Sequence, residues 1–247
     1  MNDTVVIGGT GIVGRATMLA FGITDQISLD SQTITWEAAK HKKYVFICLP
    51  TPVLNGEYQL DEMTKVIEKV SSTNNIVIVR STVTPGYCRK MEALVGSPIA
   101  SNPEFLTEST WEADAKYPKM LVIGADSPKV RDDVFALYRG RYSYMAPIIT
   151  DTITAEMIKL VFNCWFSTKV MFFNEIYDIA QKQGANYETI RKAIENHPWG
   201  AKHHTQAIFK DKRGIRGRCL PKDLEAFAQY SGSRLLQTIH DMNRRFL

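Results

Sequence analysis

Five short runs of apolar, mostly β-branched residues alternate with helical stretches through the first half of the chain. The runs TVVIG, QISLD, YVFICLP, NIVIVRST and MLVIGA are nearly all apolar, as strands buried on both faces of a sheet are. The stretches GRATMLAFG, LDEMTKVIEKVSS and PKVRDDVFALYRG have the pattern of helices between them. Strand–helix alternation of this kind predicts an α/β fold built on a parallel, doubly wound sheet.

The second half of the chain has a different pattern. One long helical stretch runs from Thr152 to about Gly184, and NYETIRKAIEN predicts another helix. We expect a final helix from about Lys222 to the C-terminus. The sequence therefore predicts a sheet domain over residues 1–147 and an all-helical domain with one long central helix over residues 148–247.

Three glycines in GxGxxG spacing follow the first expected strand and open the next helix. Such glycines allow a tight turn, backbone approach to a pyrophosphate, and close packing of helix on strand, while the helix N-terminus holds the anion. Asp30 is expected to end the second strand, where a carboxylate binds a ribose diol and favours NAD over NADP. This predicts a Rossmann-type NAD-binding domain. A tight turn in some other α/β protein, with Asp30 solvated, is the alternative. The expected cofactor contacts in the loop are Gly9, Gly11, Ile12, Val13 and Gly14.

The composition of the chain limits the classes of partner that it is expected to bind. A net charge of +4, with 23% charged residues, is consistent with an anionic small molecule but lacks the concentrated basic face of a nucleic-acid binder. The four cysteines have no zinc-like spacing, so no metal is expected. No signal peptide fits the N-terminus, and polar residues interrupt the apolar run IKLVFNCWFSTKVMFF, which argues against a membrane span. We expect a cytoplasmic protein.

Cys219 lies in RGIRGRCLPKDLEAF, residues 213–227, between a glycine–arginine loop and the expected start of a helix. Pro221 and Asp223 suit the first turn of that helix. The helix N-terminus and the cations Arg216, Arg218 and Lys222 all favour the thiolate, the nucleophilic form of cysteine. A buried structural cysteine is the alternative, and its cationic, glycine-rich neighbours disfavour it. An NAD site and a nucleophilic thiol together indicate aldehyde oxidation through a thiohemiacetal and a thioester.

Seven segments resemble the UDP-glucose/GDP-mannose dehydrogenase family, in the order that the family has them. These enzymes take a nucleotide-sugar alcohol through the aldehyde to the acid with two molecules of NAD. The segments are GTGIVG (9–14), CLPTP (48–52), STVTPG (81–86), NPEFLTES (102–109), AEMIKLVFN (155–163), NE (174–175) and GRCLPKD (217–223).

The resemblance implies catalytic roles for residues in two of these segments. In GRCLPKD the family's nucleophile falls on Cys219, its assisting acid falls on Asp223, and Lys222 falls near the cofactor. In AEMIKLVFN, Lys159 and Asn163 fall on the positions that stabilise the oxyanion. They are four residues apart and therefore share one face of a helix. A surface lysine is the alternative for Lys159, and its apolar neighbours disfavour that alternative.

Two further segments imply the remaining site residues. Glu104 and Glu108 match the family's two glutamates, which organise water together with Thr82, and a glutamate or its bound water serves as base in alcohol oxidation. The alternative is a helix capped by Asn102 with acids in its first turns. Further expected cofactor contacts are Asp30, Thr51, Thr82, Glu108 and Lys222. Expected substrate contacts are Glu104, Phe105, Leu106, Lys159, Asn163, Arg216, Gly217 and Cys219.

The sequence departs from the family at three places. The segment 31–47 after the second strand is short, and the chain ends soon after Cys219, where family members continue into a nucleotide-binding domain; the resemblance implies a shortened form without it. The stretches HPWGAKHH and HTQAIFKDKRGIRGRC replace the family's arginine motif and sugar-binding loop. The cations of this loop either contact substrate phosphates or form a solvated basic loop. They are Lys210, Lys212, Arg213, Arg216 and Arg218.

The sequence thus predicts an NAD-dependent dehydrogenase of a nucleotide sugar, such as UDP-glucose, or of another phosphorylated alcohol. Two alternatives stay open: a single-step hydroxyacid-type dehydrogenase, which has no need of Cys219, and a non-catalytic remnant that binds NAD or a nucleotide sugar. The helix expected over residues 152–184 is too apolar to be covered by the remaining helices. We therefore expect a homodimer through this helix, as the family resemblance also implies.

Overall fold

The computed structural model describes residues 3–200 and 202–246, which fall into two compact units. Unit 1 holds the residues up to Thr51 together with Gln59–Lys159, and unit 2 holds Pro52–Tyr58 together with the residues from Leu160 onward. The short segment 52–58 therefore belongs with helices that lie more than a hundred positions later in the chain.

Unit 1 is built on a seven-stranded sheet in the order β2-β1-β3-β6-β7-β8-β9. Every adjacent pair is parallel except β7 and β8, an antiparallel pair that the apolar runs do not predict. From β1 the sheet grows in one direction to β2 and in the other to β3, so the topological switch point lies between β1 and β3. The predicted doubly wound α/β fold is confirmed. The strands are β1 (Thr4–Ile7), β2 (Gln26–Ile27), β3 (Tyr44–Ile47), β6 (Ile76–Val79), β7 (Ile99–Ser101), β8 (Val122–Gly124) and β9 (Ile148–Thr150).

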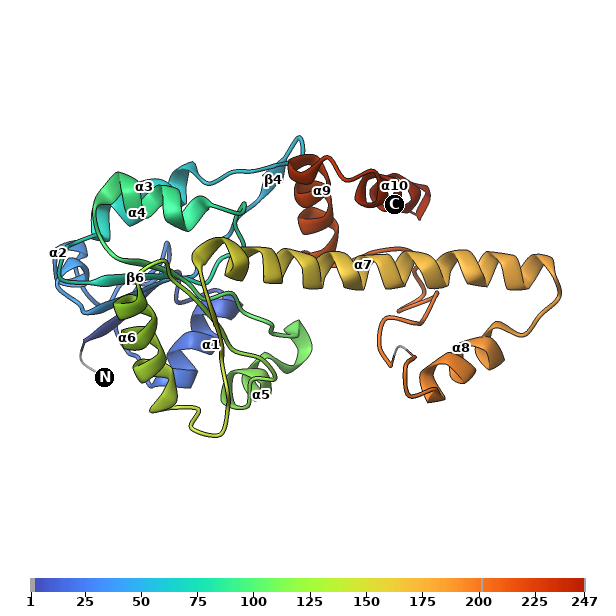
Figure 1. The fold of residues 1–247 in the computed structure, drawn as a ribbon, viewed down its shortest axis with the longest axis horizontal. Helices are drawn as coiled ribbons and strands as arrows, with labels where there is room; N and C mark the ends of the chain where they lie inside the picture. Colours follow the sequence, from blue (N-terminus) through green and yellow to red (C-terminus); the bar gives the residue numbers. More distant parts are fainter. Residues whose placement is uncertain (1–2, 201, 247) are drawn as a thin grey trace. The chain divides into compact units, whose positions relative to one another are not determined.

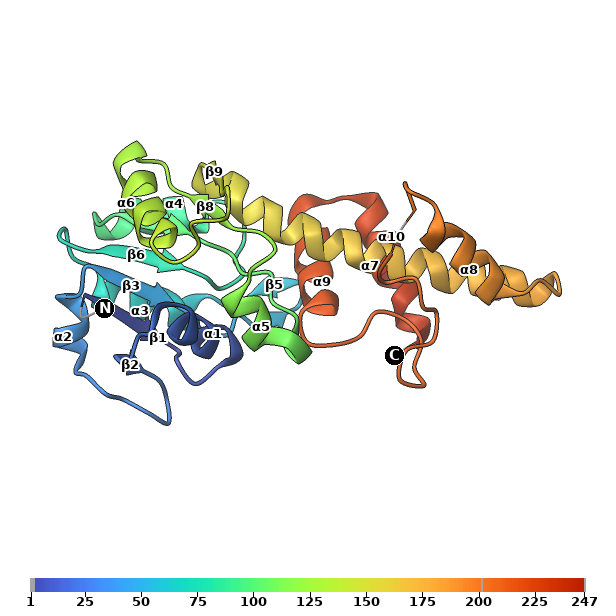
Figure 2. The ribbon, with the colours of Figure 1, turned by 90° about the horizontal axis from the view of Figure 1, so that it is seen from below.

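Helices cover both faces of this sheet (Figure 1). Successive strand residues point to opposite faces, so Val6 and Phe46 pack with α1 (Ile12–Phe21) and α6 (Pro128–Arg139). Their neighbours Ile7 and Ile47 pack with α2 (Trp36–Lys40), α3 (Asp61–Val70) and α4 (Tyr87–Val95). A 3₁₀ turn, η1 (Glu108–Thr110), leads into α5 (Trp111–Lys116), which lies against α1. Figure 2 shows the same layers from a second direction.

The second strand is shorter than the sequence predicts. β2 ends at Ile27, because the chain turns back on itself there: Ser28 N–H donates to Ser31 O, and Thr33 N–H donates to Gln26 O. Asp30 therefore does not end the strand but lies three residues beyond it, exposed in this turn.

Unit 2 combines helices with one small hairpin. The long predicted helix is present as α7 (Thr152–Lys182), whose first residues belong to unit 1; α8 (Tyr187–Asn196) follows, and Tyr187 and Ile194 pack against α7. The hairpin joins β4 (Val53–Leu54) to β5 (Glu57–Tyr58) through Asn55 and Gly56, both at positive φ, as a two-residue hairpin turn requires. Among the described residues, no helix has both the length and the hydropathy needed to span a membrane.

The predicted final helix is two helices. α9 (Leu220–Ser231) ends at Gly232, which has a left-handed φ of 61°, and the Ser233 side chain accepts a hydrogen bond from Leu236 N–H to start α10 (Arg234–Asn243). A left-handed residue cannot continue a right-handed helix, so the chain changes direction here. A 3₁₀ turn, η2 (Arg244–Phe246), ends the described part of the chain.

We predict opposite effects for alanine at two helix-terminal glycines. Gly232→Ala should lower the free energy of unfolding by about 1 kcal/mol, since a Cβ at positive φ is strained. Gly140 ends α6 at a φ of −62°, and an added Cβ would lie 3.7 Å from its nearest neighbouring atom. Gly140→Ala should therefore raise the free energy of unfolding by about 0.5 kcal/mol. Thermal unfolding of the two variants checks this; the same sign for both would contradict it.

Candidate active site

The glycines of the loop between β1 and α1 are needed for two different reasons. A Cβ on Gly9 would lie 2.0 Å from Gln26 Oε1, and one on Gly14 would lie 2.1 Å from Gly8 O, so both positions are filled by the protein itself. A Cβ on Gly11 would meet only Gly8 O, at 3.6 Å. The N-terminus of α1 has no side-chain cap and no acidic residue in its first turn. The amides at the start of α1, which include those of Ile12 and Val13, are therefore suited to bind an anion beside Gly11.

Other predicted cofactor residues lie in loops at the same edge of the sheet. Thr51 follows β3 and is buried, and Thr82 follows β6 and is partly exposed. Ser81 Oγ donates to Leu49 O at 2.7 Å, which ties these two loops together. The turn that holds Asp30 is tied to the glycine loop, because Thr10 N–H donates to Ser28 Oγ at 3.2 Å. Ser28 was not identified from the sequence.

Lys159 and Glu104 form a buried ion pair. Lys159 Nζ lies 3.1 Å from Glu104 Oε1 and donates to Glu104 O at 2.8 Å, and its side chain is 8% exposed. The ring of Phe105 lies 5.3 Å from the ammonium. Glu104 also accepts from Leu106 N–H through its second oxygen at 2.6 Å, so the segment 104–106 curls around one carboxylate. Lys159 is therefore not a surface lysine, the alternative that its apolar neighbours disfavour.

Glu108 is not part of this pair. It lies exposed in η1, and the segment 102–107 forms no helix, so the four-residue spacing does not place the two glutamates on one helical face. The alternative role of Asn102 as a helix cap is also wrong. Asn102 is fully buried and donates through Nδ2 to Val122 O at 2.6 Å.

Glu156 positions Lys159 and was not singled out in the sequence. Its two carboxylate oxygens accept from the backbone N–H groups of Gly86, at 2.5 Å, and Cys88, at 2.9 Å, at the start of α4. Burial raises the pKa of Glu156. Because Glu156 and Lys159 are three residues apart on α7, this clamp sets the rotation of the helix that carries Lys159. The same spacing is the signal that sequence reading could have used.

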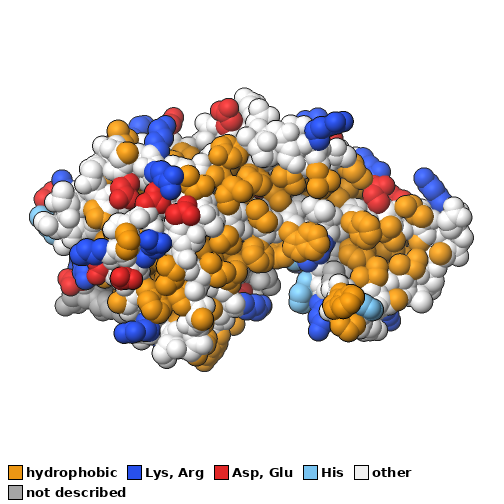
Figure 3. All heavy atoms as spheres, viewed as in Figure 1, with side chains coloured by type: hydrophobic (Ala, Val, Ile, Leu, Met, Phe, Trp, Pro, Cys, Tyr) orange, Lys and Arg blue, Asp and Glu red, His pale blue; other side chains and the backbone are white. Residues whose placement is uncertain are grey.

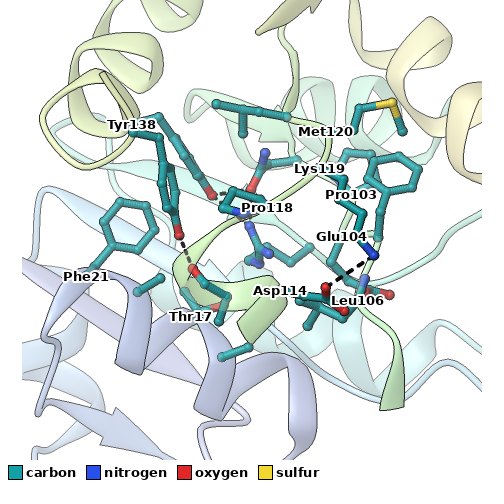
Figure 4. Close-up of a pocket in the computed structure, with 18 residues that line it drawn as sticks. Thr17, Phe21, Pro103, Glu104, Leu106, Asp114, Pro118, Lys119, Met120 and Tyr138 are labelled. Atoms are coloured by element: carbon teal, nitrogen blue, oxygen red, sulfur yellow. Dashed lines mark hydrogen bonds and ion pairs between the residues drawn. The ribbon is translucent and has the colours of Figure 1, made fainter. Parts of the chain in front are cut away.

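A small cavity of about 40 Å³ lies behind Glu104 (Figure 4). Thr17 and Phe21 of α1 line one side of it, and Glu104 and Leu106 line another. The guanidinium of Arg80 is also at its wall and donates to Tyr138 Oη at 2.7 Å and to the Asn102 side chain. Burial disfavours this cation, but Tyr138, Cys48 and Glu104 outweigh burial and raise the pKa of Arg80. Glu104 therefore has a second cation near it.

In unit 2, Cys219 directly precedes α9 and is exposed, with Pro221 in the first turn of the helix. The other three cysteines are buried. Burial raises the pKa of Cys48 to about 11 and that of Cys164 to about 12, and it also raises the pKa of Cys88. These three thiols stay neutral near pH 7, which leaves Cys219 as the accessible candidate nucleophile.

Asp223 is completely buried one turn into α9 and accepts hydrogen bonds from three elements of unit 2. Asn163 Nδ2 of α7 donates to Oδ2 at 2.6 Å, and Lys222 Nζ and Tyr58 Oη donate to Oδ1 at 2.5 and 2.7 Å. The structure thus joins Asn163 to Asp223, two residues to which the resemblance assigns separate catalytic roles. Tyr58 was missed, because it comes from the hairpin at residues 53–58 and only the Asn-Gly turn hinted at that hairpin.

Two cations of the loop before Cys219 are already bound within the protein. Arg213 binds Asp178 at 2.6 Å and the side chain and backbone carbonyl of Asn174. Arg216 donates to the carbonyl oxygens of Arg213 and Phe246. Gly217 has a φ of 89° and open space around it. Within residues 3–200 and 202–246, no cluster of three or more His, Cys, Asp or Glu side chains is placed to hold a metal ion.

Two family models match the chain on either side of a short gap. The NAD binding domain of the UDP-glucose/GDP-mannose dehydrogenase family matches residues 23–141, and the central domain of the same family matches residues 153–245. The chain belongs to this family. NAD is its cofactor, and the open space at Gly11 and the amides at the start of α1 fit a dinucleotide pyrophosphate.

Known members of the family differ in their sugar substrate. The chain is 31% identical, over 84% of its length, to a UDP-glucose 6-dehydrogenase of Rickettsia bellii, and 34% identical, over 80%, to a GDP-mannose 6-dehydrogenase of Pseudomonas syringae. It spans about half of each of these relatives, 50% and 48%. A solved UDP-glucose dehydrogenase of Pyrobaculum islandicum has the same fold, with a TM-score of 0.84 at 22% identity, over 100% of this chain and 68% of that chain.

We predict that alanine at Gly11 and at Gly14 separates cofactor binding from folding. Gly11→Ala should keep the melting temperature and weaken NAD binding at least about tenfold, because the new Cβ blocks approach of the pyrophosphate. Gly14→Ala should cost about 2 kcal/mol of stability, since its Cβ strikes the backbone of Gly8. Thermal melting and NAD titration by calorimetry check the pair. Unchanged NAD affinity in Gly11→Ala would contradict the binding of the pyrophosphate beside Gly11.

Proposed function

We propose that the chain is an NAD-dependent nucleotide-sugar dehydrogenase that oxidises a primary alcohol of a UDP-glucose-like substrate to the carboxylate. The observation that carries the proposal is that one helix, α7, contributes to two separate pairs of polar side chains. Lys159 is held by Glu104, and Asn163, one turn further along α7, is held by Asp223 beside Cys219. Family membership supports the substrate class, since the relatives named above act on UDP-glucose or GDP-mannose.

The residues of this chain have distinct parts in the proposed reaction. When bound, NAD accepts one hydride in each of two oxidations. Glu104, or water bound to it, removes the proton of the substrate hydroxyl, and the Lys159 ammonium stabilises the negative oxygen. The Cys219 thiolate adds to the aldehyde carbon to form a thiohemiacetal, and Asn163 donates a hydrogen bond to the oxygen there.

Loss of the second hydride leaves a thioester on Cys219, which water cleaves to the acid. One alcohol, two NAD and one water thus give one carboxylate, two NADH and three protons, and Cys219 returns to its starting form. Asp223 is held by three hydrogen-bond donors. We therefore propose that it orients the groups around it during hydrolysis. The predicted cofactor contacts of Asp30, Thr51, Thr82, Glu108 and Lys222 form part of this proposal.

We also propose that residues 1–147 form the dinucleotide-binding domain and residues 148–247 the helical domain. The gap between the two family-model matches, residues 142–152, contains this boundary, which supports it. An exposed thiol at Cys219 suits a reducing compartment, so we place the protein in the cytoplasm.

We further propose a homodimer through α7. Four large apolar side chains of this helix are about half exposed: Val161, Trp165, Phe172 and Ile179 at 49, 54, 53 and 51%. At 100° per residue they fall on one stripe of the helix. Figure 3 shows hydrophobic side chains gathered along the line of α7. An apolar stripe of this length is typical of a surface that another protein chain covers.

We predict that the chain forms two NADH per acid from UDP-glucose or GDP-mannose, measured by absorbance and by product chromatography. In Cys219→Ser, the rate of conversion of the alcohol to the acid should fall on the order of a thousandfold, since the variant lacks the nucleophile. Cys48→Ala, which changes a buried neutral thiol, should keep the two-to-one ratio. Equal yields of acid from Cys219→Ser and the wild type would reject the mechanism.

We predict a mass of twice 27.9 kDa in solution, measured by light scattering or sedimentation. Phe172→Glu, in the middle of the apolar stripe, should shift the protein to monomer, because dimerisation would bury its charge. Tyr117→Glu changes a side chain in unit 1 that is 71% exposed and should leave the dimer intact. A monomeric wild type would contradict the proposed dimer.

A further inference from the structure

The hairpin Val53–Tyr58 is attached to α9 at two points. Tyr58 Oη donates to Asp223 Oδ1 at 2.7 Å, and Gly56 N–H donates to Glu225 Oε1 at 3.0 Å. A Cβ on Gly56 would come within 3.1 Å of the Gln229 side chain, so the turn of the hairpin lies directly against the helix. The two attachments fix where the Tyr58 hydroxyl lies relative to α9.

The hydrogen bonds of Asp223 identify it as a fixed acceptor. Tyr58, Asn163 and Lys222 all donate to it, and the carboxyl group is fully buried. Only an ionised carboxylate accepts from every partner without a donor of its own. In this arrangement the value of Asp223 to the site is the position and charge that it imposes on its neighbours.

Tyr58 is suited to be a permanent donor. Burial, followed by the charge and hydrogen bond of Asp223, raises the pKa of Tyr58 far above its usual value, so the phenol stays protonated throughout the range in which the protein folds. The same hydroxyl feels the charge of a Cys219 thiolate, which places Cys219 and Tyr58 within electrostatic reach of each other. The Lys222 ammonium lies 4.7 Å from the centre of the Tyr58 ring.

We propose that Tyr58 is a positioning residue for Cys219 and acts through Asp223. Its hydroxyl spreads the negative charge of the Asp223 carboxylate and holds that carboxylate in the geometry that Asn163 shares. Without this donor, the charge of Asp223 concentrates on the first turn of the helix that Cys219 begins, and a nearby anion disfavours the thiolate. The role of the thiol in catalysis rests on the proposed function; the effect of Tyr58 on the thiol does not.

Several charged or titratable groups lie on the elements around this carboxylate and thiol. From α9 these are Lys222, Asp223 and Glu225; from the hairpin, Glu57 and Tyr58; from the loop before α9, Arg216 and Arg218; and from α7, Cys164. Of these, Tyr58 is the one that can lose its hydrogen bond without a change of formal charge or ring packing. Tyr58→Phe therefore isolates the hydroxyl.

The experiment measures the rate of Cys219 alkylation by iodoacetamide against pH, with Cys219→Ser as the blank. The other three thiols are buried, so the reaction reports on Cys219. Tyr58→Phe should raise the midpoint of the pH profile by about half a unit. This shift corresponds to a reaction that is about threefold slower near neutral pH. Tyr187→Phe removes another buried hydroxyl of unit 2, which donates to Thr205 O, and should leave the midpoint unchanged.

Two further variants keep the proposal testable if Tyr58→Phe folds poorly. Gly56→Ala places a Cβ at positive φ against the Gln229 side chain, loosens the hairpin without a change of charge, and should shift the midpoint the same way by a smaller amount. In an Asp223→Asn background, Tyr58→Phe should have no further effect. An unchanged midpoint in folded Tyr58→Phe and in Gly56→Ala, or an equal shift in Tyr187→Phe, overturns the proposal.

The outcome is separate from that of the proposed function, because alkylation needs neither NAD nor substrate. A shifted midpoint in a chain that forms no NADH would reject the dehydrogenase activity and keep the role of Tyr58. NADH formation with an unshifted midpoint would reject the role of Tyr58 alone.

Discussion

Helix α7 buries several polar side chains and exposes several large apolar ones, and most of the site depends on this arrangement. Six polar residues of the helix are at most 7% exposed: Thr152, Glu156, Lys159, Asn163, Ser167 and Asn174. At 100° per residue they fall within one sector, about opposite the stripe that holds Trp165 and Phe172. Each buried polar group needs a partner, and the partners include the two pairs proposed to be catalytic, Lys159 with Glu104 and Asn163 with Asp223. The exposed apolar stripe is the matching reason to expect a second chain.

The buried pairs of α7 are held separately in each of the two units. Within unit 1, Glu156 anchors α7 to α4 one turn before Lys159, and Arg80 supplies a second cation near Glu104. Within unit 2, Asp223 gathers donors from a hairpin, from α7 and from α9. An unpaired partner in either set would leave a buried charge or donor at high free energy. Replacing one member of a pair therefore disturbs both position and protonation.

Local sequence patterns predicted what depends on local physics. The buried strands, the long helix and the glycine loop each follow from spacing and side-chain type, and the structure contains all three. The errors have two sources: local turns that interrupt a strand or helix pattern, and contacts between residues far apart in the chain. The turn after Ile27 shortens β2 and places Asp30 beyond the strand, Gly232 divides the last helix, and no helix begins at Asn102. Tyr58 could not be found from its neighbours, since its partner is 165 positions away.

Capture of the covalent intermediate tests the central claim most directly. The chain is mixed with NAD and UDP-glucose or GDP-mannose, stopped with acid, and digested for mass spectrometry of the peptide that contains Cys219. The mechanism predicts a sugar-acyl thioester on that peptide, formed at the expense of NAD and absent from Cys219→Ser. Formation of the acid with no adduct on Cys219, and at the same rate in Cys219→Ser, would contradict it.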